Sequence, residues 1–189
     1  YRGDVAERQI SLLSSSFACG LLSGVLDDEP NIVSAELLLR ERGIELIEDK
    51  RPGRGAFASL IRAHLTTRDG ERVVAGTLFG ENMPRLVQLG PHQLEAFLDG
   101  HLLIFQHSDI PGIIGAVGSI CGRHGVNIAQ MAVGRASPGG EAIGILNLDG
   151  PASESAIDEI AGHEAISRIR CIELPQAGEV PIWLEGPKG

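Results

Sequence analysis

The sequence is short of aromatic residues, of cysteines and of long apolar runs, and each shortage excludes a class of protein. Only 4% of the 189 residues are aromatic, but 43% are apolar, which is enough for packed cores. The apolar runs are far shorter than the roughly 20 residues that cross a bilayer, so we expect no membrane partner. The three widely spaced cysteines, Cys19, Cys121 and Cys171, argue against a disulfide framework and for a reducing, cytoplasmic location.

The sequence also lacks an excess of basic residues. Its net charge is −9, whereas a domain that grips a phosphate backbone usually shows a basic face, so we expect no nucleic-acid partner. Gly122-Arg123-His124-Gly125 resembles the GxxG loop of KH nucleic-acid modules. Here the stretch follows a helix pattern and precedes a strand pattern, which favours a helix C-cap.

No catalytic or metal-binding motif stands out. The sequence has no GxGxxG after a strand, no phosphate-loop lysine, no HExxH and no paired CxxC. We therefore expect no catalytic residue, no metal site and no cofactor in this segment. The serine run Ser14–Ser16 has no neighbouring His or Asp, which favours an exposed helix surface. The chain begins at Tyr1, on what reads as the end of a strand, so we expect further domains upstream.

Two helices are predicted near the start of the chain. The first is indicated by apolar residues at helical spacing: Ile10, Leu13, Phe17, Leu21 and Val25. The second is expected between a cap at Asn31 and a stop at Gly43, and a short strand is expected at Ile44–Ile47.

A β-hairpin and two further strands complete the first segment. Apolar and polar side chains alternate from Ile61, the dipeptide Asp69-Gly70 supplies a turn, and Val73–Phe79 returns. The two further strands are expected at Leu86–Leu89 and Leu94–Phe97.

The second segment shows a clearer pattern, which predicts four strands and two helices. Its first helix is expected from Pro111 to Gly125, and its second begins at the cap Ser153. The strands are expected at Leu102–Phe105, Asn127–Val133, Ala142–Leu148 and Ile166–Leu174. We therefore expect an α+β chain: an α/β domain in residues 1–100, a ferredoxin-like βαββαβ domain in residues 101–175, and an extended tail in residues 176–189.

Polar residues flank the first helix of this βαββαβ pattern. His107 and Asp109 lie at a strand-to-helix turn, and Asn127 starts the next strand. We expect both positions to lie at the same end of the domain, where a carboxylate, an amide and a helix N-terminus suit a small zwitterion. The alternative is that Asp109 only caps the helix and Asn127 only fits a tight turn. The residues alone leave both interpretations open.

The stretches around these residues resemble a known family. Asp109-x-Pro111-Gly112-Ile113-Ile114-Gly115, Gly125-Val126-Asn127-Ile128-Ala129 and Met131-x-Val133-Gly134-Arg135 are similar to the ACT regulatory domain of the D-3-phosphoglycerate dehydrogenase family. Asn31-x-x-Ser34-Ala35 and Gly76-Thr77-Leu78-Phe79-Gly80 resemble the intervening domain that precedes the ACT domain in the long, type 1 members. The resemblance covers nearly the whole chain.

The resemblance implies a regulatory segment of an NAD-dependent enzyme of L-serine biosynthesis. NAD and the catalytic residues would belong to upstream domains, and the ACT domains would self-associate into a homo-oligomer. L-serine would bind between two ACT domains, on His107, Asp109 and Asn127 with the flanking Gly112, Ile113 and Ile128.

The resemblance also implies an anion site in the intervening domain. Arg85 and His92 fall where some relatives carry basic residues. Phe97 falls where another relative has Arg, which departs from the pattern of a second such site.

Two other interpretations stay open. The first is a regulatory part of an iron–sulfur L-serine dehydratase, whose Ser-Ser-Ser-His-Thr type of motif is missing here because Phe17 follows Ser16. The second is a free-standing ACT module that binds an amino acid without an attached enzyme.

Overall fold

The computed structural model describes residues 1–26, 30–179 and 184, whose four α-helices and two antiparallel sheets confirm the predicted α+β class. Tyr1–Ile61 and Arg62–Gly178 form two compact units. Most of the predicted tail, residues 176–189, lies outside the described residues, and the predicted division near residue 100 stays a prediction. No helix in the described part of the chain is long and apolar enough to cross a bilayer.

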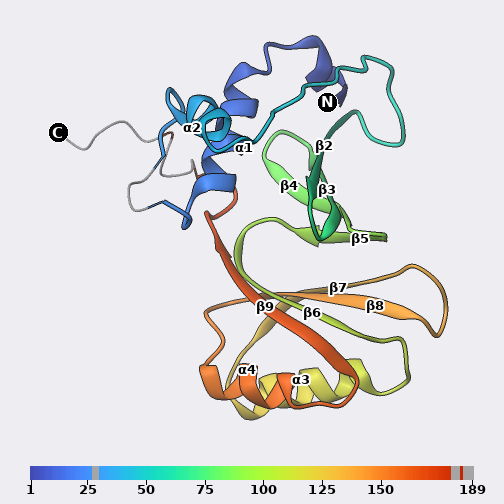
Figure 1. Ribbon diagram of the computed structural model, residues 1–189. Coiled ribbons are helices and arrows are strands. Elements are labelled where there is room, and N and C mark those ends of the chain that lie inside the picture. Colours follow the sequence, from blue (N-terminus) through green and yellow to red (C-terminus); the bar gives the residue numbers. More distant parts are fainter. Residues whose placement is uncertain (27–29, 180–183, 185–189) are drawn as a thin grey trace. The chain divides into compact units, whose positions relative to one another are not determined.

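The elements follow one another in the order shown in Figure 1. Those before residue 100 are β1 (Arg2–Gly3), η1 (Asp4–Glu7), α1 (Ser11–Leu22), α2 (Ala35–Glu41), β2 (Ser59–Thr67), β3 (Gly70–Phe79), β4 (Met83–Leu89) and β5 (His92–Phe97). Those after it are β6 (Gly100–Ser108), α3 (Ile113–Arg123), β7 (Ile128–Arg135), β8 (Glu141–Leu148), α4 (Glu154–Ala161) and β9 (Ile166–Leu174).

Helices α1 and α2 bury three small side chains and two leucines between them. Their shared core consists of Ala18, Cys19, Leu22, Ala35 and Leu39. The apolar face predicted for the first helix is therefore only partly right, because Leu13 and Phe17 are each 37% exposed. Small residues such as Ala and Cys let two helix backbones approach closely, and hydrophobic spacing alone does not show this preference.

The predicted serine surface is wrong for one residue. Ser14 is 1% exposed, lies 2.7 Å from the hydroxyl of Tyr1, and donates a hydrogen bond to Glu48. A buried hydroxyl needs such partners, and both come from parts of the chain that are distant in sequence.

The end of α2 agrees with the sequence signals, but its N-cap is Ser34, three residues after the predicted cap Asn31, and the strand predicted after the helix does not form. The side chain of Asn31 accepts hydrogen bonds from the N–H groups of Val33 and Ser34, and Gly43 ends the helix with a φ of 72°. The segment Ile44–Ile47 belongs to no sheet, so the predicted strand is wrong. Ile44 packs on the helix core while Ile47 is 77% exposed, and no neighbouring strand pairs with them.

The predicted hairpin and strands form a five-stranded sheet. Its order is β1-β2-β3-β4-β5, and the turn between β2 and β3 is formed by Arg68 and Asp69, one residue before the predicted Asp69-Gly70. Gly70 has a φ of 118°, a conformation that favours glycine. Strands β4 and β5 pair from Leu89 opposite His92 to Arg85 opposite Phe97.

The second sheet has the strand order β7-β8-β6-β9, which confirms the ferredoxin-like prediction. Because β8 pairs antiparallel with both β6 and β7, those two strands run in the same direction. Helices α3 and α4 cover one face of this sheet (Figure 1). The core beneath them includes Leu103, Phe105, Val117, Leu146 and Ile160.

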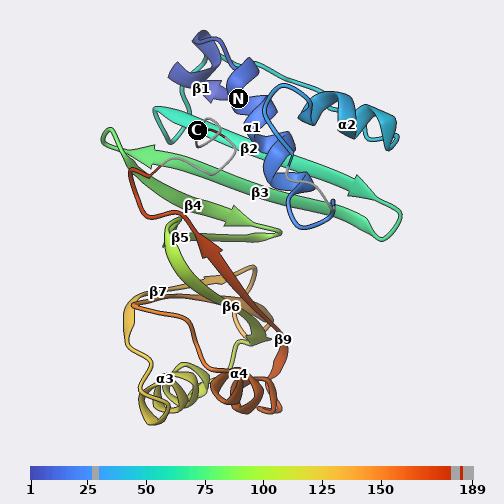
Figure 2. The ribbon, with the colours of Figure 1, turned by 90° about the vertical axis from the view of Figure 1, so that its left-hand side faces the viewer.

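The other face of this sheet packs against β4 and β5, which lie with it in the unit Arg62–Gly178 (Figure 2). The shared core consists of Leu86, Ala96, Leu102, Ala132 and Ile145. Strand β5 comes so close to β7 that a Cβ on Gly134 would lie 2.9 Å from the carbonyl oxygen of Gln93. The central strands β6 and β8 are thus covered on both faces, whereas the edge strands β7 and β9 keep exposed side chains.

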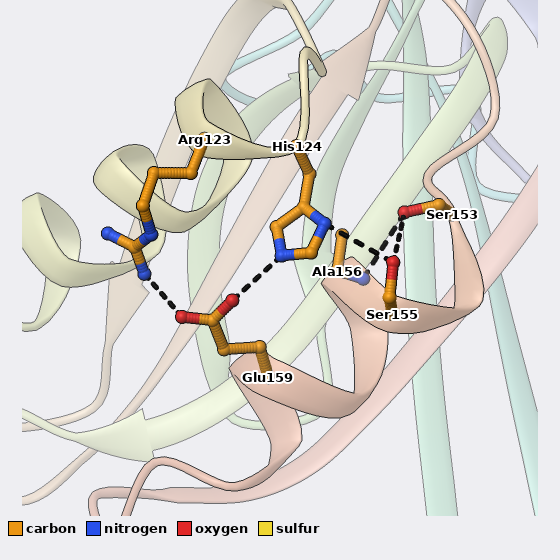
Figure 3. Close-up of polar contacts among 6 residues, drawn as sticks. All are labelled: Arg123, His124, Ser153, Ser155, Ala156 and Glu159. Carbon is orange, nitrogen blue, oxygen red and sulfur yellow. Dashed lines mark hydrogen bonds and ion pairs between the residues drawn. The ribbon is translucent and has the colours of Figure 1, made fainter.

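A chain of polar contacts joins the end of α3 to the start of α4 (Figure 3). Nε2 of His124 lies 2.7 Å from Glu159, and its Nδ1 lies 3.2 Å from the hydroxyl of Ser155. Arg123 pairs with the same carboxylate. The predicted cap is also present, since Ser153 accepts the N–H of Ala156. The Gly122–Gly125 stretch therefore ends a helix, as predicted, and its two polar side chains bind the neighbouring helix.

The contact between Gly144 and Phe105 leads to a prediction about packing. A Cβ on Gly144 would lie 2.2 Å from Cζ of the fully buried Phe105 ring. We expect Gly144→Ala to lower the free energy of unfolding by about 1–3 kcal/mol, the usual cost of overpacking. Urea denaturation measures this loss. Gly122→Ala is the control, because a Cβ there meets nothing within 4 Å, and unchanged stability of Gly144→Ala would contradict the packing described.

The carboxylate of Glu159 leads to a prediction about pH. Hydrogen bonds from His124 and Arg123 hold the pKa of Glu159 below its ordinary value. Because the folded pKa is depressed, this stabilisation is present above the ordinary carboxyl pKa and is lost as the pH falls through the folded pKa. We expect Glu159→Gln to lower the melting temperature slightly at neutral pH and not at all in strong acid, with Glu164→Gln as control. A difference that persists in acid would rule out this pairing.

Candidate functional site

The carboxyl end of β6 places a buried imidazole among apolar side chains. His107 is 2% exposed, and its ring lies 5.3 Å from that of Phe105. Its Nδ1 lies 2.8 Å from the carbonyl oxygen of Ser108, so Nδ1 carries the proton that this acceptor requires. Its Nε2 is buried without a hydrogen-bond partner among the described residues. An unpartnered buried nitrogen is costly, and a ligand with an N–H or O–H group would satisfy it.

Asp109 follows on the loop between β6 and α3, with its side chain 23% exposed. Its carboxylate accepts the N–H of Gly139 at 2.9 Å and lies 3.4 Å from Nη1 of Arg135. The N–H of Gly139, helped by the hydrogen bond and the charge of Arg135, holds the pKa of Asp109 below its ordinary value. Asp109 is therefore an anion at neutral pH, within Coulombic range of the buried imidazole.

The helix α3 begins directly after this loop. Gly112 is its N-cap, with a φ of 95° and nothing within 4 Å of the place where a Cβ would lie. Pro111 precedes the helix rather than opening its first turn. Ile113 is 3% exposed and anchors the helix in the core. No side chain caps this N-terminus, so its first N–H groups have no partner within the helix.

Asn127 and Ile128 lie elsewhere. Ile128 pairs with Leu148, which in turn pairs with His101 at the amino end of β6. His107 lies at the other end, in one row with Ala142. The two rows are six residue positions apart along β8, or about 20 Å of strand. The expectation that Asp109 and Asn127 lie at the same end of one chain is therefore wrong.

The direction of α3 explains this correction. The helix leaves the carboxyl end of β6 and must return the chain to the amino end of the parallel strand β7. Residues before and after such a crossover helix consequently lie at opposite ends of the sheet. At its own end, Asn127 donates a 2.6 Å hydrogen bond from Nδ2 to Asp149, which leaves its Oδ1 as an acceptor.

The two basic residues expected at an anion site also lie apart. Arg85 pairs with Phe97 and His92 pairs with Leu89, at opposite ends of the β4–β5 pair. The guanidinium of Arg85 lies 3.9 Å from the ring centre of Phe97 and 3.9 Å from Glu95. His92 is 2% exposed, and its Nδ1 has no hydrogen-bond partner among the described residues. The structure therefore does not bring these two residues into one site.

Three groups at the site were not identified from the sequence. They are the guanidinium of Arg135, the N–H of Gly139 and the carboxylate of Asp149. Strand register is the signal that would have found Arg135. It pairs with Ala142, which also pairs with His107, so all three lie in one row across the sheet.

The described residues offer no metal centre and place a cavity away from this row. No three His, Cys, Asp or Glu side chains in the described part of the chain could jointly hold a metal ion. A cavity of about 230 Å³ lies at the opposite end of the sheet, between β6, β9 and the loop before α4. Its lining includes His101, Ala152 and Cys171, and it contains none of the predicted effector residues.

Comparison with known proteins identifies both segments. Residues 1–90 match the family model described as the D-3-phosphoglycerate dehydrogenase intervening domain, and residues 101–164 match the ACT domain. A D-3-phosphoglycerate dehydrogenase of Archaeoglobus fulgidus is 32% identical over 91% of this chain, and one of Bacillus subtilis is 30% identical over 93%. One of a Synechocystis species is 34% identical over 84% of the chain.

The chain spans about a third of the length of these relatives: 33%, 33% and 29% respectively. The two matched segments also agree with the observed elements, because the second contains the strands and helices of the ferredoxin-like fold from β6 through α4. The chain therefore belongs to the D-3-phosphoglycerate dehydrogenase family, of which it holds the intervening domain and the ACT domain.

Proposed function

We propose that this chain is the part of an NAD-dependent D-3-phosphoglycerate dehydrogenase that binds L-serine as a feedback effector between two ACT domains. One observation carries the proposal: the ionised Asp109 lies two residues after His107, whose buried Nε2 has no hydrogen-bond partner among the described residues, on the loop that leads to the uncapped start of α3. Both side-chain groups accept hydrogen bonds. L-serine brings donors of the matching kind, an ammonium group and a hydroxyl.

A second copy of the chain would complete the site. Strand β7 is at the edge of its sheet, so another β7 can pair with it antiparallel about a twofold axis. That pairing sets the amino end of one β7 beside the carboxyl end of the other. Asn127 of the second copy would then approach Asp109 of the first. Its Oδ1 would accept a further hydrogen bond, because Asp149 already orients the amide.

The surface of β7 supports this pairing. Met131 and Val133 point to the helix-covered face, yet each is 43% exposed at the open edge. Ile110, on the loop before α3, is 47% exposed. Burying three such side chains would favour association by roughly 25 cal/mol for each Å² of apolar surface removed from water.

The catalytic role of the whole enzyme would belong to the parts of the relatives outside this chain. There, NAD would accept the hydride from 3-phosphoglycerate in the cytoplasm. Serine would act at a distance by favouring one arrangement of the paired ACT domains. Allosteric coupling of this kind is typically about 1–3 kcal/mol, or about 5- to 150-fold in affinity. An anion site in the intervening domain would rest on Arg85 alone, since His92 lies at the other end of the strand pair.

Removing the negative charge at Asp109 tests the effector site. We expect Asp109→Asn to weaken L-serine binding about tenfold or more, because a hydrogen bond to a charged partner is lost. Isothermal titration calorimetry on the 189-residue chain measures this change. Asp158→Asn is the matched control, on the exposed face of α4. If the wild-type chain gives no heat with L-serine, the proposed function fails.

Mixing two inactive variants tests whether two chains share each site. Asp109→Asn and Asn127→Ala should each bind poorly alone. In a mixed dimer, one site would combine Asp109 of one chain with Asn127 of the other, and that site would be intact. After subunit exchange we expect about a quarter of the wild-type binding capacity to return. No recovery, despite exchange shown by native mass spectrometry, would exclude a shared site.

A further inference from the structure

The predicted effector residues supply one charge where a zwitterion needs two. Asp109 offers a negative charge to the ammonium group, while His107 and Asn127 offer the hydrogen-bond acceptors Nε2 and Oδ1. None of these groups balances the carboxylate of an amino acid. On a chain of net charge −9, an uncompensated second anion beside Asp109 would be repelled.

We infer that Arg135 binds the carboxylate of the effector and thereby selects amino acids over amines that lack this group. This inference rests on the proposed function. Arg135 lies in the same cross-strand row as His107, and directly paired residues of an antiparallel sheet point to the same face. Its guanidinium already lies within 3.4 Å of Asp109, which places the two opposite charges side by side.

The present contact leaves most of the guanidinium available. A charge-assisted hydrogen bond usually measures about 2.7–2.9 Å, so the 3.4 Å contact with Asp109 is a loose one. The same Asp109 oxygen is more tightly bound by the N–H of Gly139, at 2.9 Å. An arginine has five N–H donors in a planar fork that matches a carboxylate. Arg135 can therefore bind an effector carboxylate while it stays close to Asp109.

The backbone of Arg135 is held in place while its side chain stays accessible. The preceding residue, Gly134, packs against the main chain of Gln93, which fixes this part of β7. The side chain of Arg135 itself is 58% exposed, at the open edge of the sheet. A rigid strand carrying an accessible cation suits recognition of a small anion, because little ordering is needed on binding.

The uncapped N-terminus of α3 is the alternative binding site for the carboxylate. Its N–H groups also favour an anion. If Arg135 binds the carboxylate, removing its charge should abolish the preference for ligands with a carboxylate; if the N-terminus of α3 binds it, the preference should remain. Comparing the affinities for L-serine and L-serinamide distinguishes these two cases. The amide keeps the ammonium and hydroxyl groups but has no carboxylate.

Calorimetric titration of L-serine and of L-serinamide into the wild-type chain and into the Arg135→Gln and Arg135→Lys variants tests this inference. The control variant is Arg168→Gln, which lies on the exposed part of β9. We expect the wild type to prefer L-serine over L-serinamide by about tenfold or more. Arg135→Gln should lose this preference while its affinity for L-serinamide stays within about twofold. Arg135→Lys should keep part of the preference, and the control should keep all of it.

Two outcomes would overturn the inference while leaving the proposed function intact. If Arg135→Gln keeps the full preference, the carboxylate binds elsewhere, as at the start of α3. If both ligands weaken equally, Arg135 only positions Asp109. Binding of neither ligand to a folded wild-type chain would overturn the proposed function and this inference together.

Discussion

The parallel direction of β6 and β7 is the constraint on which the arrangement of this site depends. Helix α3 can join these strands only by running back along the sheet, so the groups before and after it lie at opposite ends. His107 and Asp109 are thereby separated from Asn127 by the length of the sheet. The proposed sharing of one effector by two chains follows from this geometry, because antiparallel pairing of two β7 edges reunites the separated ends.

The packing of the four-stranded sheet leaves only a narrow region for such a site. One face lies under α3 and α4, and the other lies against β5 and its neighbours. Glycine is needed on both faces: Gly144 makes room for the ring of Phe105, and Gly134 lets the main chain of β5 approach β7. The exposed parts of this sheet are consequently its strand ends and its two edges, β7 and β9, and the polar row of His107 and Arg135 reaches the β7 edge.

Electrostatics then distinguishes the two ends of the sheet. At one end, Asp109 is ionised and lies beside Arg135, so opposite charges are available to a zwitterion. At the other end, the amide of Asn127 is held by Asp149 and presents its oxygen. Each end alone offers an incomplete set of partners. This incompleteness gives a physical reason why an ACT domain would sense an amino acid as a dimer.

The sequence by itself determined the local structure of this chain. Hydrophobic spacing and turn residues located the hairpin turn to within one residue, together with the cap at Ser153 and the whole of β9, because these signals depend on neighbours along the chain. It also pointed to His107 and Asp109 as residues at one strand-to-helix turn. The strand predicted at Ile44–Ile47 failed for a different reason: an extended segment becomes a strand only where another strand lies beside it.

Only the tertiary structure decided which distant residues meet. The burial of Ser14 against Tyr1 and Glu48, the separation of Arg85 from His92, and the contact of Arg135 with Asp109 all depend on register and crossover direction. Periodicity does not reveal these features. The alternation of side chains shows which residues share one face of a strand, but it does not show which strand lies beside it or in which register the two strands pair. Strand direction and register select among those pairings, and they result from the packing of the complete sheet.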